Sequence, residues 1–103
     1  MYKKQTYIFQ DALTGLYKIG KSANPKKRFK NIKAYAPGLK IVDICNIDIE
    51  NYLHKYFKQK RVANEWFELT NEDMIWIRYY MAQVNLKYLE LKKATEVANK
   101  TKN

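Results

Sequence analysis

The chain has 103 residues, 47% of them apolar, so it can form one hydrophobic core but is too short for two. Its 20 Lys and Arg outnumber its 10 Asp and Glu, and the formal net charge of +10 favours nucleic acid, an anionic membrane or an acidic protein as the partner. No apolar run reaches the roughly 20 residues of a membrane span, and no signal peptide follows Met1. We therefore expect an intracellular protein, cytoplasmic or, in a eukaryote, nuclear, that is not secreted and has no membrane partner. One cysteine and one histidine exclude a disulfide framework and a Cys/His zinc site.

The first part of the chain predicts a β-hairpin, a helix and a strand. Residues 6–10 and 16–20 are rich in β-forming side chains, and the loop between them includes a glycine that can take a positive φ angle. Asn24 can cap a helix over about 25–35, in which proline occupies the first turn. A third strand is then predicted over 39–45, because its centre is strongly apolar.

The middle of the chain predicts a second helix and a short strand. Asp48 can cap a helix that runs over about 49–59. A polar turn at 60–64 then leads to a short strand over about 65–69. Strands and helices alternate along the chain in a way that predicts an α+β fold, a small antiparallel three-stranded sheet flanked by helices.

The longest predicted helix comes last. Thr70 and Asp73 resemble a capping box that begins it, and a tail from Ala94 onward is expected to fray. Its apolar side chains follow each other by alternating steps of three and four residues, which defines a heptad seam: Met74, Ile77, Met81, Val84, Tyr88 and Leu91. Part of this seam can cover the domain, and the rest can meet a second copy or another protein. We therefore divide the chain into a domain over 1–70 and a C-terminal helix over 71–103.

A basic window lies between Asp11 and Asp43, where the chain has eight Lys or Arg and no acid. On the helix predicted there, apolar side chains share one stripe and the lysines fall outside it. Such a one-sided basic face is typical of nucleic-acid binding. The residues predicted to bind the nucleic acid are Lys21, Lys26, Lys27, Lys30 and Lys33.

Two motifs in this part of the chain resemble the GIY-YIG nuclease superfamily. Gln5-Thr6-Tyr7 stands where that superfamily has its first signature tripeptide, and Lys18-Ile19-Gly20 stands where it has the second. Lys18 follows Tyr7 by 11 residues and Arg28 follows Lys18 by 10, and these spacings agree with those of the superfamily.

Two motifs further along are similar to one compact branch of this superfamily. They are Glu50-Asn51-Tyr52-Leu53-His54 and Asn64-Glu65-Trp66-Phe67. The branch is found in phages, large DNA viruses and fungi, and its domains were first catalogued from a phage open reading frame 172 and a meiotically up-regulated gene. The resemblance covers roughly residues 5 to 70.

The resemblance implies an endonuclease that hydrolyses DNA phosphodiester bonds with a divalent metal, Mg²⁺ or Mn²⁺. Arg28 would donate to a non-bridging phosphate oxygen, and Glu50 would hold the metal ion. Tyr7 would orient or deprotonate the attacking water, helped by positive charge from Lys18 and Lys21. The predicted catalytic residues are Tyr7, Lys18, Arg28, Glu50 and His54.

The same residues also have structural interpretations. Tyr7 can be an aromatic residue of the sheet, Glu50 can stabilise a helix N-terminus, and His54 can be an exposed helix residue or a phosphate contact. Lys18 replaces the second signature tyrosine and cannot form a phenolate, so a catalytically silent DNA-binding module is an alternative function. The heptad seam indicates a third alternative function, that of a protein-interaction or inhibitor module.

Overall fold

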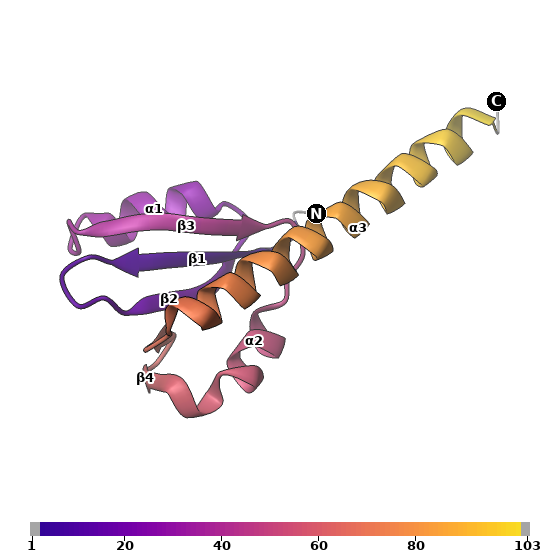
Figure 1. The fold of residues 1–103 in the computed structure, drawn as a ribbon. Coiled ribbons are helices and arrows are strands. Elements are labelled where there is room, and N and C mark those ends of the chain that lie inside the picture. Colours follow the sequence, from indigo (N-terminus) through magenta and orange to yellow (C-terminus); the bar gives the residue numbers. More distant parts are fainter. Residues whose placement is uncertain (1–2, 102–103) are drawn as a thin grey trace.

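The computed structural model describes residues 3–101 and shows an antiparallel sheet with helices on both faces (Figure 1). The strands, in the spatial order β3-β1-β2-β5-β4, are β1 (Gln5–Asp11), β2 (Tyr17–Ser22), β3 (Leu39–Cys45), β4 (Arg61–Ala63) and β5 (Trp66–Phe67). The helices are α1 (Pro25–Lys33), α2 (Glu50–Tyr56), a 3₁₀ turn η1 (Lys58–Lys60) and α3 (Asn71–Thr101). The predicted α+β fold with a long C-terminal helix is thus confirmed. None of the helices in this part of the chain has both the length and the apolar character needed to cross a lipid bilayer.

The sheet has five strands, so the predicted number of three is wrong. The polar turn predicted at 60–64 contains all of β4, whose three residues are exposed and therefore lack the alternation that reveals a half-buried strand. Asn64 takes a φ of 50°, in the left-handed region, where the chain reverses into β5. β5 in turn pairs with β2, with Trp66 opposite Lys18.

The central strand β1 sends alternate side chains to two hydrophobic clusters. Tyr7 and Phe9 lie on the α1 side, stacked with ring centroids 4.1 Å apart, and pack with Ile32 and Leu39. Ile8 faces the opposite side, where it packs with residues of β2, β3, β5, α2 with its C-terminal cap, and α3: Ile19, Cys45, Leu53, Phe57, Phe67, Met74, Ile77 and Met81. The sheet therefore has α1 on one face and α2 and α3 on the other.

Helix α1 begins as predicted. The side chain of Asn24 accepts a hydrogen bond from the Lys27 amide at 3.1 Å, and Pro25 occupies the first turn. The helix ends at Lys33, two residues before the predicted end. Pro37 limits how far the helix could continue, because a proline disfavours helical backbone at the residue before it, Ala36.

Helix α2 is shorter than predicted, since it runs over Glu50–Tyr56 and is followed by η1. Asp48 lies one residue before the capping position, and its carboxylate accepts a hydrogen bond from the Glu50 amide at 3.2 Å. Aromatic stacking joins α2 to α3: the rings of Tyr56 and Trp76 lie 4.3 Å apart, and the Trp76 ring stacks in turn on Tyr80. This contact fixes the position of α2, and hence of Glu50, relative to the sheet.

Helix α3 begins with the predicted capping box. The Asp73 amide donates to Thr70 Oγ1 at 3.1 Å, and the Thr70 amide donates to the Asp73 carboxylate at 2.9 Å. The first three residues of the predicted seam are buried against the sheet, whereas Leu91 is 57% exposed. Beyond the sheet the helix projects away from the body (Figure 1) and continues through Thr101, so the segment from Ala94 to Thr101 is helical where a frayed tail is predicted.

Candidate active site

The two motifs of the first hairpin are in direct contact. Tyr7 on β1 pairs with Gly20 on β2, and a Cβ atom added at Gly20 would overlap the hydroxyl and ring of Tyr7. The tyrosine is 1% exposed and is held on its other side by Phe9. Glycine at position 20 is therefore needed because the Tyr7 ring lies against the backbone there.

Charged groups from three other segments act on the Tyr7 phenol. Burial, the largest cause, raises the pKa of Tyr7 to about 12. The negative charges of Glu65 and Glu50 also raise this pKa, and the positive charge of Arg28 lowers it. The fold therefore brings predicted residues of β1, α1 and α2 into electrostatic range of one another, together with Glu65 of the β4–β5 turn.

Lys18 lies on the same face of β2 as Gly20, and its charge is paired. Its Nζ atom is 3.7 Å from Glu65 Oε1 and 5.3 Å from the centroid of the Trp66 ring. The Ile19 amide donates to the Glu65 carbonyl at 3.0 Å, so strand pairing holds Glu65 beside Lys18. Lys18 is not among the charges that shift the pKa of Tyr7.

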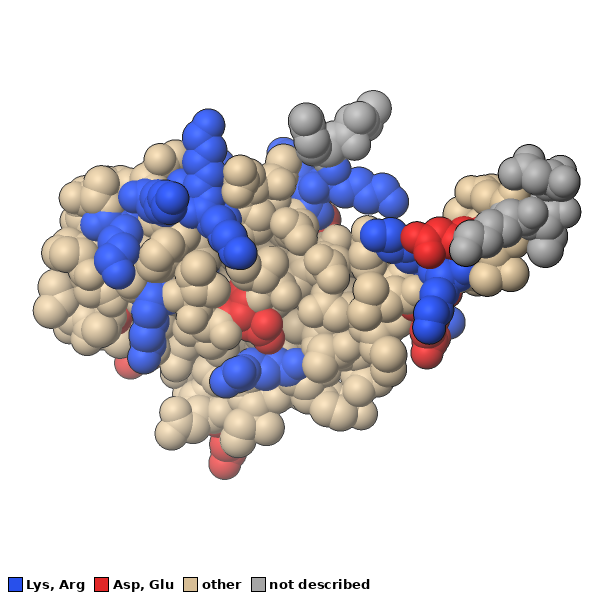
Figure 2. All heavy atoms as spheres, turned by 90° about the horizontal axis from the view of Figure 1, so that it is seen from above, with Lys and Arg blue, Asp and Glu red and all other residues tan. Residues whose placement is uncertain are grey.

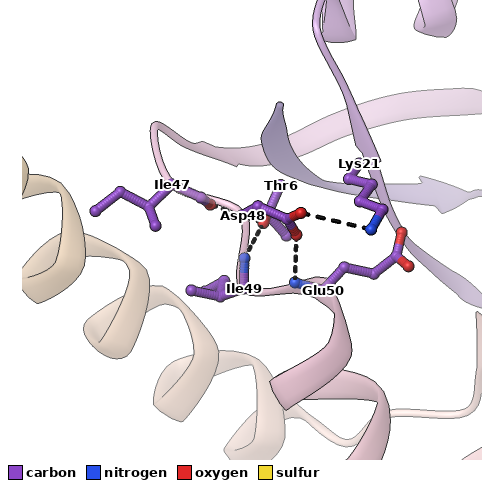
Figure 3. A network of polar contacts seen from close by, with 6 residues as sticks. All are labelled: Thr6, Lys21, Ile47, Asp48, Ile49 and Glu50. Atoms are coloured by element: carbon purple, nitrogen blue, oxygen red, sulfur yellow. Dashed lines mark hydrogen bonds and ion pairs between the residues drawn. The ribbon is translucent and has the colours of Figure 1, made fainter. Parts of the chain in front are cut away.

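Lys21 does not join Lys18 beside Tyr7, because residues three apart on a strand point to opposite faces. Its Nζ atom lies 3.5 Å from Asp48 Oδ2 in the loop before α2 (Figure 3). In the same view the Glu50 side chain extends toward the side on which the Lys21 ammonium lies. The interpretation of Lys21 as a source of charge for Tyr7 is therefore wrong, and its structural partner is Asp48.

The loop that leads into α2 is attached to β1 through Thr6 (Figure 3). Thr6 is fully buried, and its hydroxyl donates to the Ile47 carbonyl at 2.8 Å while it accepts from the Ile49 amide at 2.7 Å. Thr6 directly precedes Tyr7, and Ile49 directly precedes Glu50. One hydroxyl thus connects the strand that carries Tyr7 to the helix that carries Glu50.

His54 is half-buried and fixed in orientation. Its Nε2 atom lies 2.8 Å from the Ile19 carbonyl oxygen, and its ring makes an edge contact with Phe67. Because a carbonyl can only accept, Nε2 must carry the hydrogen. This hydrogen bond fits a positioning role against β2 as well as the predicted role in proton transfer.

The predicted DNA-binding lysines of α1 form an exposed basic surface. Lys26, Lys27, Lys30 and Lys33 are all exposed, as is Arg28. The view of Figure 2 shows Lys and Arg side chains gathered over the part of the body where α1 lies. Lys33 bends over the Phe29 ring, with its Nζ atom 5.3 Å from the centroid. This surface adjoins the site because Arg28 belongs to the same helix.

Glu50 is the residue that could hold a metal ion. Among residues 3–101 no three His, Cys, Asp or Glu side chains cluster in a way that could form a protein-only metal site. Mg²⁺ is commonly bound by one or two carboxylates, with waters and substrate phosphates as its other ligands. A single half-buried carboxylate at the start of α2 fits that kind of site, which is completed by the nucleic acid.

Glu65 is missing from the predicted catalytic set, although the structure places it beside Lys18 and within electrostatic range of Tyr7. The motif that contains it is visible in the sequence, but its location depends on the pairing of β5 with β2. One feature of the sequence does point to it. Asn64, which is suited to a tight turn, stands just before the aromatic pair Trp66-Phe67, and this short spacing predicts a hairpin turn at Glu65.

The chain belongs to the T5orf172 domain family, whose model matches residues 4–81. This family is often linked to nuclease and DNA-binding functions. The match covers the whole sheet, α1, α2 and the first part of α3, and it confirms the predicted resemblance to the phage open reading frame 172 branch. No significant match was found among curated proteins or among solved structures.

Tyr7 is expected to stay protonated at a pH where ordinary tyrosines ionise, because its pKa is about 12 rather than 10.0. The folded-state pKa lies above the unfolded value, so the stability contributed by the neutral phenol is complete below pH 10.0 and is lost as pH rises toward about 12. Spectroscopic titration of phenolate absorbance should show a high-pKa component that disappears in Tyr7→Phe. Tyr80→Phe is the control, because the pKa of Tyr80 is also raised and its removal should leave the component of about 12 in place.

Proposed function

We propose that this chain binds DNA and hydrolyses its phosphodiester bonds with the help of a divalent metal ion. The observation that carries the proposal is that the charges of Arg28, Glu50 and Glu65 all act on the buried phenol of Tyr7, beside the basic surface of α1. The resemblance of the hairpin motifs to GIY-YIG nucleases and the membership of the T5orf172 domain family support the same function.

Each residue suits one requirement of phosphodiester hydrolysis. The anionic oxygens of the phosphate repel a nucleophile, so the site must neutralise charge and orient water. The exposed guanidinium of Arg28 can donate two hydrogen bonds to one phosphate. A Mg²⁺ or Mn²⁺ ion bound at Glu50 would supply further positive charge and acidify a bound water.

Tyr7 acts in this proposal as a hydrogen-bond donor. With a pKa of about 12 its phenol keeps its proton at neutral pH, so it orients an oxygen atom rather than removing a proton. The Lys18–Glu65 pair lies on the same face of the sheet as Tyr7. The Lys18 ammonium would therefore lie near a DNA strand bound at this face. The approach of an anionic DNA strand would compete with Glu65 for that charge.

Purified wild-type protein is expected to nick supercoiled DNA in the presence of Mg²⁺ or Mn²⁺ and not in the presence of a chelator. The substitution Glu50→Gln keeps the shape of the side chain and removes its charge, so nicking should fall by roughly 100-fold or more. Glu68→Gln is the matched control, since Glu68 is an exposed carboxylate that does not act on Tyr7, and its activity should stay unchanged.

Two results would contradict this proposal in different ways. A wild-type protein that nicks neither supercoiled nor single-stranded DNA with either metal removes the enzymatic function. An active wild type with an equally active Glu50→Gln variant instead removes the assignment of the metal site.

A second candidate, a catalytically silent DNA-binding module, is favoured by the charge state of the site. The Lys18 charge is paired with Glu65, and the pKa of Tyr7 is raised rather than lowered. This module would bind DNA with an affinity that falls steeply with salt, because binding releases counterions from the phosphates. It would give a salt-dependent shift in the same preparation that shows no nicking.

A further inference from the structure

A second row of apolar side chains runs along the side of α3 that faces away from the sheet. Its members follow each other by steps of four, three, four and three residues: Ile75, Tyr79, Ala82, Leu86 and Leu89. All of them are exposed; Ile75 is 71%, Tyr79 67%, Leu86 52% and Leu89 53% exposed. We call these five residues the outer row. They differ from the predicted seam, whose first three residues are buried in the core.

The spacing of the outer row is that of a helix that packs against another helix. Alternating steps of three and four give a period of 3.5 residues, which keeps one row facing a partner helix along its length. Scattered exposed apolar residues are normal on a protein surface, but five consecutive positions of one heptad pattern form a continuous stripe. The outer row therefore indicates a helical partner.

The distribution of charge indicates that this helical partner is a second copy of the chain. Residues 71–101 have five Lys or Arg and four Asp or Glu, whereas residues 3–70 have 14 Lys or Arg and six Asp or Glu. Two copies that approach through α3 thus make contact through their nearly neutral parts, with the basic bodies on the outer sides of the two helices. A nucleic acid would instead be attracted to the basic part, away from the outer row.

We propose that two copies of this protein form a parallel two-stranded coiled coil through the outer row. In this arrangement Tyr79 and Leu86 occupy the a positions, and Ile75, Ala82 and Leu89 occupy the d positions. Lys93 takes the next a position, and a single polar residue there favours a dimer in one register.

The flanking charges favour the parallel orientation. In a parallel pair Arg78 lies near the partner's Gln83, and Lys92 lies near the partner's Val97, so no like charges meet at these flanking positions. Lys93 does face the partner's Lys93, at the end of the outer row. An antiparallel pair that aligns the same apolar residues would place Arg78 near the partner's Lys92, twice in each dimer. Like charges at such positions are destabilising.

The dimer leaves both copies of the candidate active site open. The face of α3 that packs on the sheet stays on its own body, and the outer row consists of exposed residues outside that face. The two bodies then lie on the outside of the coiled coil. This inference does not depend on the proposed nuclease activity, since it concerns only the association of α3.

Sedimentation equilibrium of the full chain over a concentration series tests the dimer. Wild type should show twice the monomer mass, and the double variant Leu86→Glu, Leu89→Glu should show the monomer mass with unchanged helical circular dichroism. Leu91→Glu is the matched control, because Leu91 is 57% exposed on the same helix but lies outside the outer row, and it should remain a dimer. A wild type that stays monomeric up to its solubility limit overturns the proposal, as does a Leu91→Glu variant that dissociates as fully as the double variant.

The orientation has its own test. Ala82→Cys places a thiol at a d position, where a parallel dimer brings the two copies together, and oxidised glutathione should convert it to a covalent dimer. Ala94→Cys is the control, since Ala94 is also exposed on α3 but lies outside the interface, and it should stay monomeric on a non-reducing gel. The native Cys45 is buried and does not interfere. Failure of Ala82→Cys to cross-link more than Ala94→Cys would overturn the parallel arrangement.

Discussion

Replacing Arg28 by alanine is expected to slow DNA nicking by about 100- to 1,000-fold, as is typical for the loss of one donor that stabilises charge in a transition state. Arg28 is exposed on α1, and its charge lowers the pKa of the Tyr7 phenol, so a phosphate that it binds would lie within electrostatic range of Tyr7. Arg28→Lys should recover only part of the rate, because an ammonium lacks the planar pair of donors. Single-turnover nicking rates measure both effects.

The matched control for Arg28 is Lys27→Ala. Lys27 is the neighbouring residue on α1 and is also exposed, and its replacement removes the same formal charge, but it does not act on Tyr7. Both variants should weaken DNA binding by a similar small factor, and only Arg28→Ala should lose the catalytic rate. Equal rates in the two variants would show that Arg28 belongs to the basic surface alone.

Replacing Gly20 by alanine is expected to lower the free energy of unfolding by about 1–3 kcal/mol, as overpacking in a filled core does. The added methyl group would overlap the Tyr7 hydroxyl and ring. Tyr7 has no room to move away, because it is 1% exposed and stacks on Phe9. Urea unfolding followed by circular dichroism measures the change.

Two further variants test the cause of this loss. Gly38→Ala is the control, because its added Cβ would meet only the side chains of Asp11 and Leu13 closely, at 3.1 Å and 3.4 Å, and both can adjust. In the second, Tyr7→Ala removes the ring, so Gly20→Ala should then cost much less than it does in wild type. Additive effects in that double variant would mean that the Tyr7–Gly20 contact is not the source of the instability.

The elements that could be predicted from the sequence are those with local signals. Asn24 and Pro25 mark the start of α1, and the reciprocal Thr70 and Asp73 pair marks the start of α3. These signals depend on side chains that bond to backbone groups a few residues away, so they need no tertiary structure. The first hairpin and β3 were likewise predictable, because their β-forming residues are contiguous.

The elements that could not be predicted depend on contacts between distant segments. β4 is wholly exposed and forms only because β5 pairs with both it and β2. The location of Glu65 beside Lys18 follows from that pairing and from nothing local. The outer row of α3 was hidden for a different reason: apolar residues surround much of this helix, and only burial separates those that form the core from those that remain exposed.

The buried hydroxyl of Thr6 has a consequence for sequence variation at this site. It both donates to and accepts from the loop before α2, so valine at position 6 would leave the Ile47 carbonyl and the Ile49 amide without their partner. The strand itself would tolerate valine, whereas the loop would have to find new hydrogen bonds and would move the start of α2 as it did so. A substitution of Thr6 would therefore mainly displace Glu50. Positions 6 and 47–49 should consequently vary together among relatives that keep the same site.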